Sequence, residues 1–101
     1  MKFYKYYSKH NNYKKKTVFP FFVIFIFNNH DVRWEIFDFD CTLFDIFDIL
    51  KKRYKIRKFS IEFDNGYECF KPFNKTIHSI TKKLDGADIR VFTEDKITFI
   101  E

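Results

Sequence analysis

The sequence predicts an α+β domain: a mostly antiparallel sheet with two helices on one face, in the order β-α-β-β-α-β-β. Three observations lead to this fold class. Residues 43–56 repeat apolar side chains at helical spacing, Asn65-Gly66 separates two short strand-like runs, and Glu94-Asp95 separates two more. The apolar run 18–27 is a candidate for an extra strand at the N-terminus.

The length and the charge distribution predict one domain, residues 18–101, preceded by a basic tail, residues 1–17. The tail carries six lysines and no acid, whereas the rest of the chain has 13 basic and 14 acidic residues. The excess positive charge therefore belongs to the tail. Such a tail suits binding to a polyanion, with a solubilising tail as the alternative.

The apolar run 18–27 (VFPFFVIFIF) has ten residues, about half of the roughly 20 that a helix needs to cross a bilayer. Asn28, Asn29, His30 and Asp31 follow it directly, so the small-residue cleavage site of a signal peptide is missing. These features favour a buried strand over membrane targeting.

The remaining elements follow in order. Residues 33–40 (RWEIFDFD) predict a strand, and residues 43–56 predict a helix whose acids precede its cations, as the helix dipole favours. Runs 59–63 and 67–70 flank Asn65-Gly66 and predict a hairpin. A second helix is expected at 75–84, capped by Asn74 or Thr76 and stopped by Gly86. Runs 89–93 and 96–100 predict a final hairpin around Glu94-Asp95.

Few residues suggest metal or nucleophile chemistry. Cys41 and Cys69 lack the spacing of a metal site or a disulfide framework, which favours free thiols in the cytosol, with Cys41 buried. His10, His30 and His78 have no nucleophile at recognisable spacing, and the two glycines form no phosphate loop. We expect no cofactor, no metal and no small-molecule substrate.

One enzyme hypothesis rests on the stretch Asp38-Phe39-Asp40-Cys41-Thr42, followed by Asp45. It resembles the first motif of haloacid-dehalogenase-type phosphohydrolases, in which one Asp attacks phosphorus and the second handles the proton. That family needs a later lysine and an acidic pair on successive parallel strands, and the predicted hairpins occupy this part of the chain. A phosphohydrolase fragment is therefore the weaker alternative.

Clustered cations are the stronger signal. Residues 51–58 (KKRYKIRK) hold six basic residues and no acid, and the predicted second helix carries three lysines. Such side chains contact the RNA backbone, and Tyr54 is a candidate for stacking on an unpaired base. The candidate RNA-binding residues, with those of the tail, are Lys14, Lys15, Lys16, Lys51, Lys52, Arg53, Lys55, Arg57, Lys58, Lys75, Lys82 and Lys83.

Residues 34–101 contain a series of short motifs, which in chain order are Phe37, Phe39 and Asp40-Cys41-Thr42; Leu50 and Arg53-Tyr54-Lys55-Ile56; Ser60-Ile61-Glu62; Pro72-Phe73-Asn74-Lys75; Ile80-Thr81-Lys82-Lys83; and Ile89-Arg90-Val91-Phe92. In this order the motifs resemble those of the eukaryote-specific ribosomal protein twenty-two of the large subunit, which is unrelated to its bacterial namesake. The chain departs from that family in a shortened loop before the first helix, in a shortened end of the second helix, in the missing acidic C-terminal tail and in residues 18–33.

The resemblance implies a non-enzymatic structural constituent of the cytoplasmic ribosome, bound to large-subunit ribosomal RNA and to neighbouring ribosomal proteins. It implies RNA contacts for Lys75, Lys82 and Lys83, on the second helix. The other candidate cations follow from charge alone. A free-standing RNA-binding regulatory module is the second hypothesis, since the same surface can act away from the ribosome.

Overall fold

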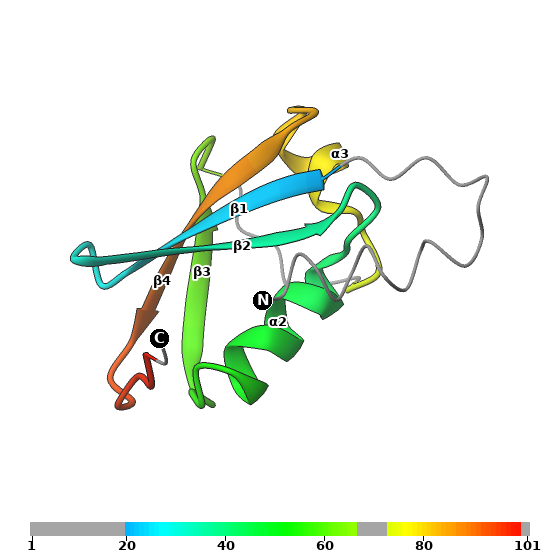
Figure 1. Ribbon diagram of the computed structural model, residues 1–101. Helices are drawn as coiled ribbons and strands as arrows, with labels where there is room; N and C mark the ends of the chain where they lie inside the picture. The colour runs from blue at the N-terminus through cyan, green and yellow to red at the C-terminus, as the bar shows by residue number, and fades with distance from the viewer. Residues whose placement is uncertain (1–19, 67–72, 100–101) are drawn as a thin grey trace.

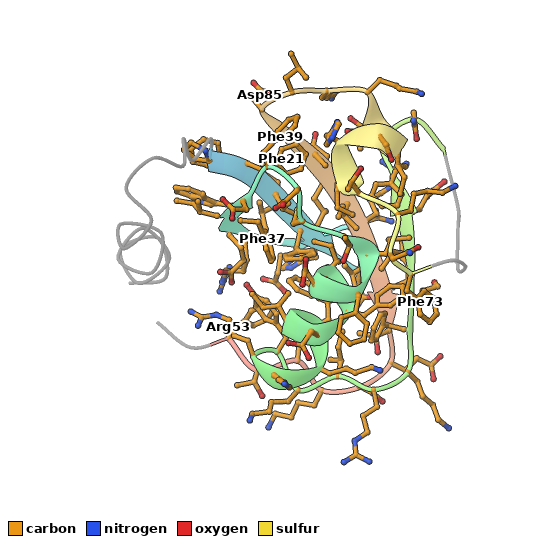
Figure 2. All side chains as sticks on the ribbon, turned by 90° about the vertical axis from the view of Figure 1, so that its right-hand side faces the viewer. Phe21, Phe37, Phe39, Arg53, Phe73 and Asp85 are labelled. Atoms are coloured by element: carbon orange, nitrogen blue, oxygen red, sulfur yellow. The ribbon has the colours of Figure 1, made fainter. Side chains whose placement is uncertain are left out.

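The computed structural model describes residues 20–66 and 73–99. Its elements are β1 (Pro20–Phe27), β2 (Asp31–Asp38), α2 (Leu43–Lys52), β3 (Phe59–Phe63), α3 (Ile77–Thr81) and β4 (Gly86–Thr93). The predicted α+β class is confirmed, and both helices cover the same face of the sheet (Figures 1 and 2). The predicted order of elements matches only in part.

The four strands form one mixed sheet in the order β2-β1-β4-β3 (Figure 1). β1 is antiparallel to β2, with Ile24 opposite Trp34, and β3 is antiparallel to β4. β1 and β4 run parallel, with Phe25 beside Ile89. The apolar run is therefore an extra strand, as predicted, and it lies in the middle of the sheet.

The hairpin that joins β1 to β2 was not predicted. Asn28 and Asn29 have φ values of 51° and 59°, as both central residues of a type I′ turn require. The amide of His30 donates to the carbonyl of Phe27 at 2.9 Å and closes the turn. Two consecutive asparagines tolerate this conformation and were the available signal.

The core lies between the sheet and the two helices. Every second residue of β1 is buried, as are the inward residues of α2, and strands β3 and β4 supply the floor. The largest fully buried side chains are Phe21, Phe25, Phe27, Phe63, Leu43, Ile46, Leu50, Ile56, Ile61, Ile77, Ile89 and Val23. Burial of each such side chain contributes roughly 1.5–3 kcal/mol relative to exposure.

The predicted final hairpin is wrong. Residues 96–99 form no strand, because both edges of β4 are already occupied by β1 and β3. Ile97 and Phe99 pack against the core, and the amide of Thr98 donates to the carbonyl of Tyr54 at 3.0 Å. In the other predicted hairpin, Gly66 follows β3 with a φ of 83°, and the predicted second strand, residues 67–70, lies outside the described residues.

Both helices are shorter than predicted. The first ends at Lys52 with Arg53 as its C-cap, and the second covers Ile77–Thr81, with Lys82 as C-cap at φ 64°. Gly86 does not stop a helix. It begins β4, where an added Cβ would collide with the carbonyl oxygen of Phe22 on β1, so the close approach of these two parallel strands requires glycine.

Candidate nucleic-acid interface

Helix α2 directs the predicted basic cluster to one end of the molecule. At its start Thr42 and Asp45 form a capping box: the amide of Thr42 donates to Asp45 Oδ2 at 2.9 Å, and the amide of Asp45 donates to Thr42 Oγ1 at 3.4 Å. Leu43, Ile46 and Leu50 fix the buried face. The last turn therefore presents its cations at the opposite end, where the helix dipole favours positive charge.

After α2 the chain alternates between buried and exposed residues. Tyr54 and Ile56 enter the core, whereas Lys55, Arg57 and Lys58 face solvent. Lys55, between these two buried residues, has a φ of 61°, a left-handed conformation that few residues other than glycine adopt. The two buried residues therefore hold the exposed cations in place.

The C-terminal segment braces this loop. One carboxylate oxygen of Asp95 accepts hydrogen bonds from the amides of Arg57 and Lys58, at 2.8 and 2.9 Å. These two backbone bonds lower the pKa of Asp95 below its ordinary value. This contact was not predicted, since Asp95 was expected at a hairpin tip and lies 38 residues from Arg57.

The cations line an open groove of about 750 Å³, formed by Lys51, Lys52, Lys55 and Arg57. Lys52 pairs with Asp48 at 3.2 Å on the exposed helix surface, a pair of the kind that contributes little. Among the described residues, no carboxylate forms a salt bridge with Lys51, Lys55 or Arg57. The groove therefore concentrates positive charge on a braced backbone.

Two residues of the predicted basic cluster, Arg53 and Tyr54, both contact Glu35. Tyr54 is only 3% exposed, and its hydroxyl donates to Glu35 Oε2 at 2.7 Å, so the prediction that it stacks on a base is wrong. Burial and the bond to Glu35 raise the pKa of Tyr54. Arg53 pairs with the same Glu35 oxygen at 3.1 Å and lies at the periphery of the molecule (Figure 2).

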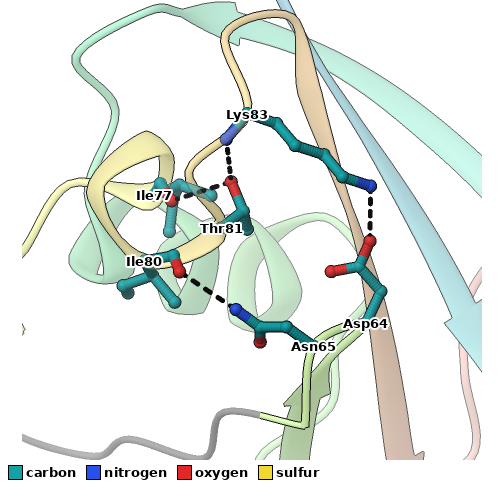
Figure 3. Close-up of polar contacts among 6 residues, drawn as sticks. All are labelled: Asp64, Asn65, Ile77, Ile80, Thr81 and Lys83. Atoms are coloured by element: carbon teal, nitrogen blue, oxygen red, sulfur yellow. Dashed lines mark hydrogen bonds and ion pairs between the residues drawn. The ribbon is translucent and has the colours of Figure 1, made fainter.

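The three lysines predicted on the second helix do not share a helical face. Lys75 precedes α3 and is half-buried, Lys82 is the left-handed C-cap, and Lys83 lies beyond it. Lys83 Nζ contacts Asp64 Oδ2 at 2.6 Å (Figure 3), and this contact raises the pKa of Lys83.

The surrounding bonds give the end of α3 a structural role. The amide of Lys83 donates to Thr81 Oγ1, and Asn65 Nδ2 donates to the carbonyl of Ile80, at 3.3 and 3.1 Å (Figure 3). The Lys83–Asp64 contact joins the same two segments. The cation of Lys83 is therefore compensated by a contact that ties α3 to the turn after β3.

The stretch that resembles a phosphohydrolase motif lies in an unsuitable setting. Asp38 ends β2, an edge strand with an antiparallel neighbour, and Asp45 is used in the capping box. Cys41 is buried and free, as predicted; burial raises its pKa, and the nearby Asp45 adds to the effect. Within residues 20–66 and 73–99, no group of three or more His, Cys, Asp or Glu could hold a metal ion.

Comparison with protein-family models and with curated proteins finds no match to this sequence. The resemblance to the ribosomal family therefore stays a prediction. Lys14, Lys15 and Lys16 lie outside the described residues. In the part of the chain that the structure describes, no helix is long and apolar enough to cross a membrane.

Proposed function

We propose that this chain binds RNA through the phosphate backbone, using the groove lined by Lys51, Lys52, Lys55 and Arg57. The observation that carries the proposal is the gathering of these side chains around one open groove. The lysine ammonium group binds phosphate as a point charge, and the arginine guanidinium group binds it through two parallel N–H donors. Neither contact requires a particular base. The binding is therefore expected to be strongly dependent on salt and weakly dependent on sequence.

The braced backbone supports a binding site over a merely solvated surface. Buried Tyr54 and Ile56, together with Asp95, hold the loop that carries Lys55 and Arg57. A cation on a fixed backbone loses less conformational freedom when it meets a phosphate than one on a mobile segment does. The six lysines of residues 1–17, which account for the net charge of +5, favour association with a polyanion.

In its most specific form, the proposal makes this chain a structural constituent of the large ribosomal subunit, in contact with its RNA and with neighbouring ribosomal proteins in the cytoplasm. The collinear motifs over residues 34–101 support this form. A free-standing RNA-binding module is the alternative, and it uses the same groove.

Sedimentation tests both forms. The tagged chain is expected to co-sediment with large ribosomal subunits through a salt wash, and the variant Lys55→Glu/Arg57→Glu to dissociate because its carboxylates repel phosphate. The matched control, Lys82→Glu/Lys83→Glu, makes the same charge change at the other cluster. Wild-type chain that binds free RNA but leaves the subunits in the wash would favour the free-standing module. Wild-type chain that binds no RNA would contradict the proposal.

A further inference from the structure

The turn after β3 contains Asn65-Gly66, a dipeptide in which the asparagine can lose its side-chain amide without an enzyme. Both residues are exposed to solvent. Gly66 has no side chain to hinder the approach of its own backbone nitrogen to Cγ of Asn65, and an added Cβ at Gly66 would meet no atom within 4 Å. The two residues therefore meet the steric and solvent requirements of the reaction.

In this reaction, deamidation, the backbone nitrogen of Gly66 gives up its proton to a base in the solvent and attacks Cγ of Asn65. The new N–Cγ bond closes a succinimide ring, the Cγ–Nδ2 bond breaks, and the side-chain nitrogen takes up a proton and leaves as ammonia. A water molecule then opens the ring at either carbonyl, which gives an aspartyl or an isoaspartyl residue. Water is consumed and ammonia is released, so the reaction needs no oxidant or reductant.

Two hydrogen bonds oppose the reaction in the folded chain. The attacking nitrogen, that of Gly66, donates to the carbonyl of Phe63 at 2.8 Å. The nitrogen that leaves, Asn65 Nδ2, donates to the carbonyl of Ile80 at 3.1 Å (Figure 3). Ring closure removes the proton from the first donor and expels the second, so both bonds must open first. The rate of deamidation therefore depends on how often the turn separates from α3.

A separate ion pair holds the same two segments together. Lys83 Nζ, beyond the end of α3, lies 2.6 Å from Asp64 Oδ2 in the turn (Figure 3). This pair opposes the separation of the turn from α3, and neither of its side chains supplies a reacting atom. Loss of the Lys83 cation should therefore change the rate of deamidation only through the frequency of opening.

The product of the reaction cannot restore the contact with α3. The carbonyls in the last turn of a helix have no intrahelical partner, and Asn65 supplies a donor for that of Ile80. A carboxylate at position 65 has no N–H to donate. It would also bring negative charge to the carbonyl oxygen of Ile80, at the negative end of the helix.

We infer that Asn65-Gly66 is a site of spontaneous deamidation, that the hydrogen bonds of this turn restrict the reaction in the folded chain, and that the modified chain loses the bond to Ile80. The inference does not depend on RNA binding. Opening of the turn is reversible before the reaction, whereas the loss of the contact is permanent after it. The modified fraction of the chain is therefore a cumulative measure of how often this end of α3 has opened.

Peptide mapping by mass spectrometry measures the deamidation rate of each asparagine of the full chain at mildly alkaline pH. Asn65 is expected to react about tenfold more slowly in the folded chain than in a peptide of residues 60–68, because two hydrogen bonds must open. In the chain unfolded in urea, Asn65 should react faster than asparagines that precede larger residues. These internal controls are Asn28, Asn29 and Asn74.

The ion pair provides a matched pair of variants. Lys83→Gln removes the contact with Asp64 and should raise the rate at Asn65 in the folded chain about two- to threefold. Lys52→Gln removes an exposed ion pair of the same kind on α2 and should leave this rate unchanged. A rate in the folded chain equal to that of the peptide, or an unchanged rate in Lys83→Gln, would show that contacts with α3 do not restrict the reaction.

The consequence of the modification is tested with Asn65→Asp, which reproduces the charge of the aspartyl product. The amides of Lys82 and Lys83, which donate to the carbonyl of His78 and to Thr81 Oγ1, should exchange faster with solvent in this variant. The matched control is Asn74→Asp, which makes the same charge change outside the turn. Unchanged exchange in Asn65→Asp would overturn the predicted loss of the contact. An Asn65 that reacts no faster than the control asparagines in urea would overturn the site itself.

Discussion

The ends of α2 and α3 each carry a group of lysines, but their surroundings differ. At α2 the cations line one groove on a loop that the core and Asp95 hold in place. At α3 Lys83 is neutralised by Asp64, Lys82 is used as a left-handed cap, and Lys75 is half-buried. The number of cations in a cluster therefore does not by itself show how much of its positive charge is uncompensated.

The largest effect is expected from loss of Glu35, which holds Tyr54 and Arg53 at the end of α2. Glu35→Ala leaves the buried hydroxyl of Tyr54 without its acceptor and frees Arg53, so the free energy of unfolding should fall by about 2–4 kcal/mol. Urea unfolding followed by circular dichroism measures it. The control is Glu62→Ala, which removes the more exposed partner of Arg90 and should cost about 1 kcal/mol or less. Equal losses in the two variants would mean that Glu35 is not an anchor.

An intermediate effect is expected from the brace at Asp95. Asp95→Ala removes the acceptor of two backbone amides, so the amides of Arg57 and Lys58 should exchange faster with solvent and RNA affinity should fall about two- to fivefold. Asp95→Asn keeps a carbonyl acceptor and is the matched control. Unchanged exchange at these two amides in Asp95→Ala would contradict the brace.

The same brace predicts a pH dependence. Because the pKa of Asp95 is lowered in the folded state, its stabilising contribution is present above the ordinary value of 3.8 and is lost as the pH falls through the folded-state pKa. The variant Asp95→Asn should therefore show a smaller loss of stability on acidification than the wild-type chain. Thermal unfolding at a series of acidic pH values checks this.

The smallest effect is expected where the α3 cluster gains charge. Asp64→Asn removes the carboxylate that compensates Lys83, so this end of the molecule should attract phosphate more strongly, with an RNA affinity raised about two- to threefold at low salt. Asp48→Asn removes the carboxylate that pairs with Lys52 at the groove. This variant should raise RNA affinity more than Asp64→Asn does. A fall in affinity in Asp64→Asn with the fold intact would contradict the idea that Asp64 shields Lys83.

The sequence predicted the elements whose signals are local. The apolar run forms β1, the apolar stripe predicted for residues 43–56 forms α2, and the cations of residues 51–58 lie at and beyond the end of that helix. Long-range contacts were not predictable. Residues 96–99 have the pattern of a strand, but β1 occupies the edge of β4 that they would need.

For the candidate site, too, the local features were predicted and the long-range contacts were not. The run of cations was visible in the sequence, whereas its supports, Glu35 and Asp95, come from segments distant in the chain. Tyr54 was assigned to RNA because it lies among cations in the sequence, whereas in the fold its ring packs against Phe27 and its hydroxyl donates to Glu35. Asp64 likewise has no local feature that predicts its pairing with Lys83.

The most direct test of the central claim compares the two clusters by the salt dependence of RNA binding. Affinity for large-subunit ribosomal RNA is measured at several salt concentrations for wild type, Lys55→Gln/Arg57→Gln and Lys82→Gln/Lys83→Gln, with circular dichroism to confirm the fold. We expect the first variant to lose about two units of slope, roughly one per phosphate contact, and the second to lose well under one unit. An unchanged slope in Lys55→Gln/Arg57→Gln with an intact fold, or a larger loss in Lys82→Gln/Lys83→Gln, would contradict the assignment of RNA binding to the groove at the end of α2.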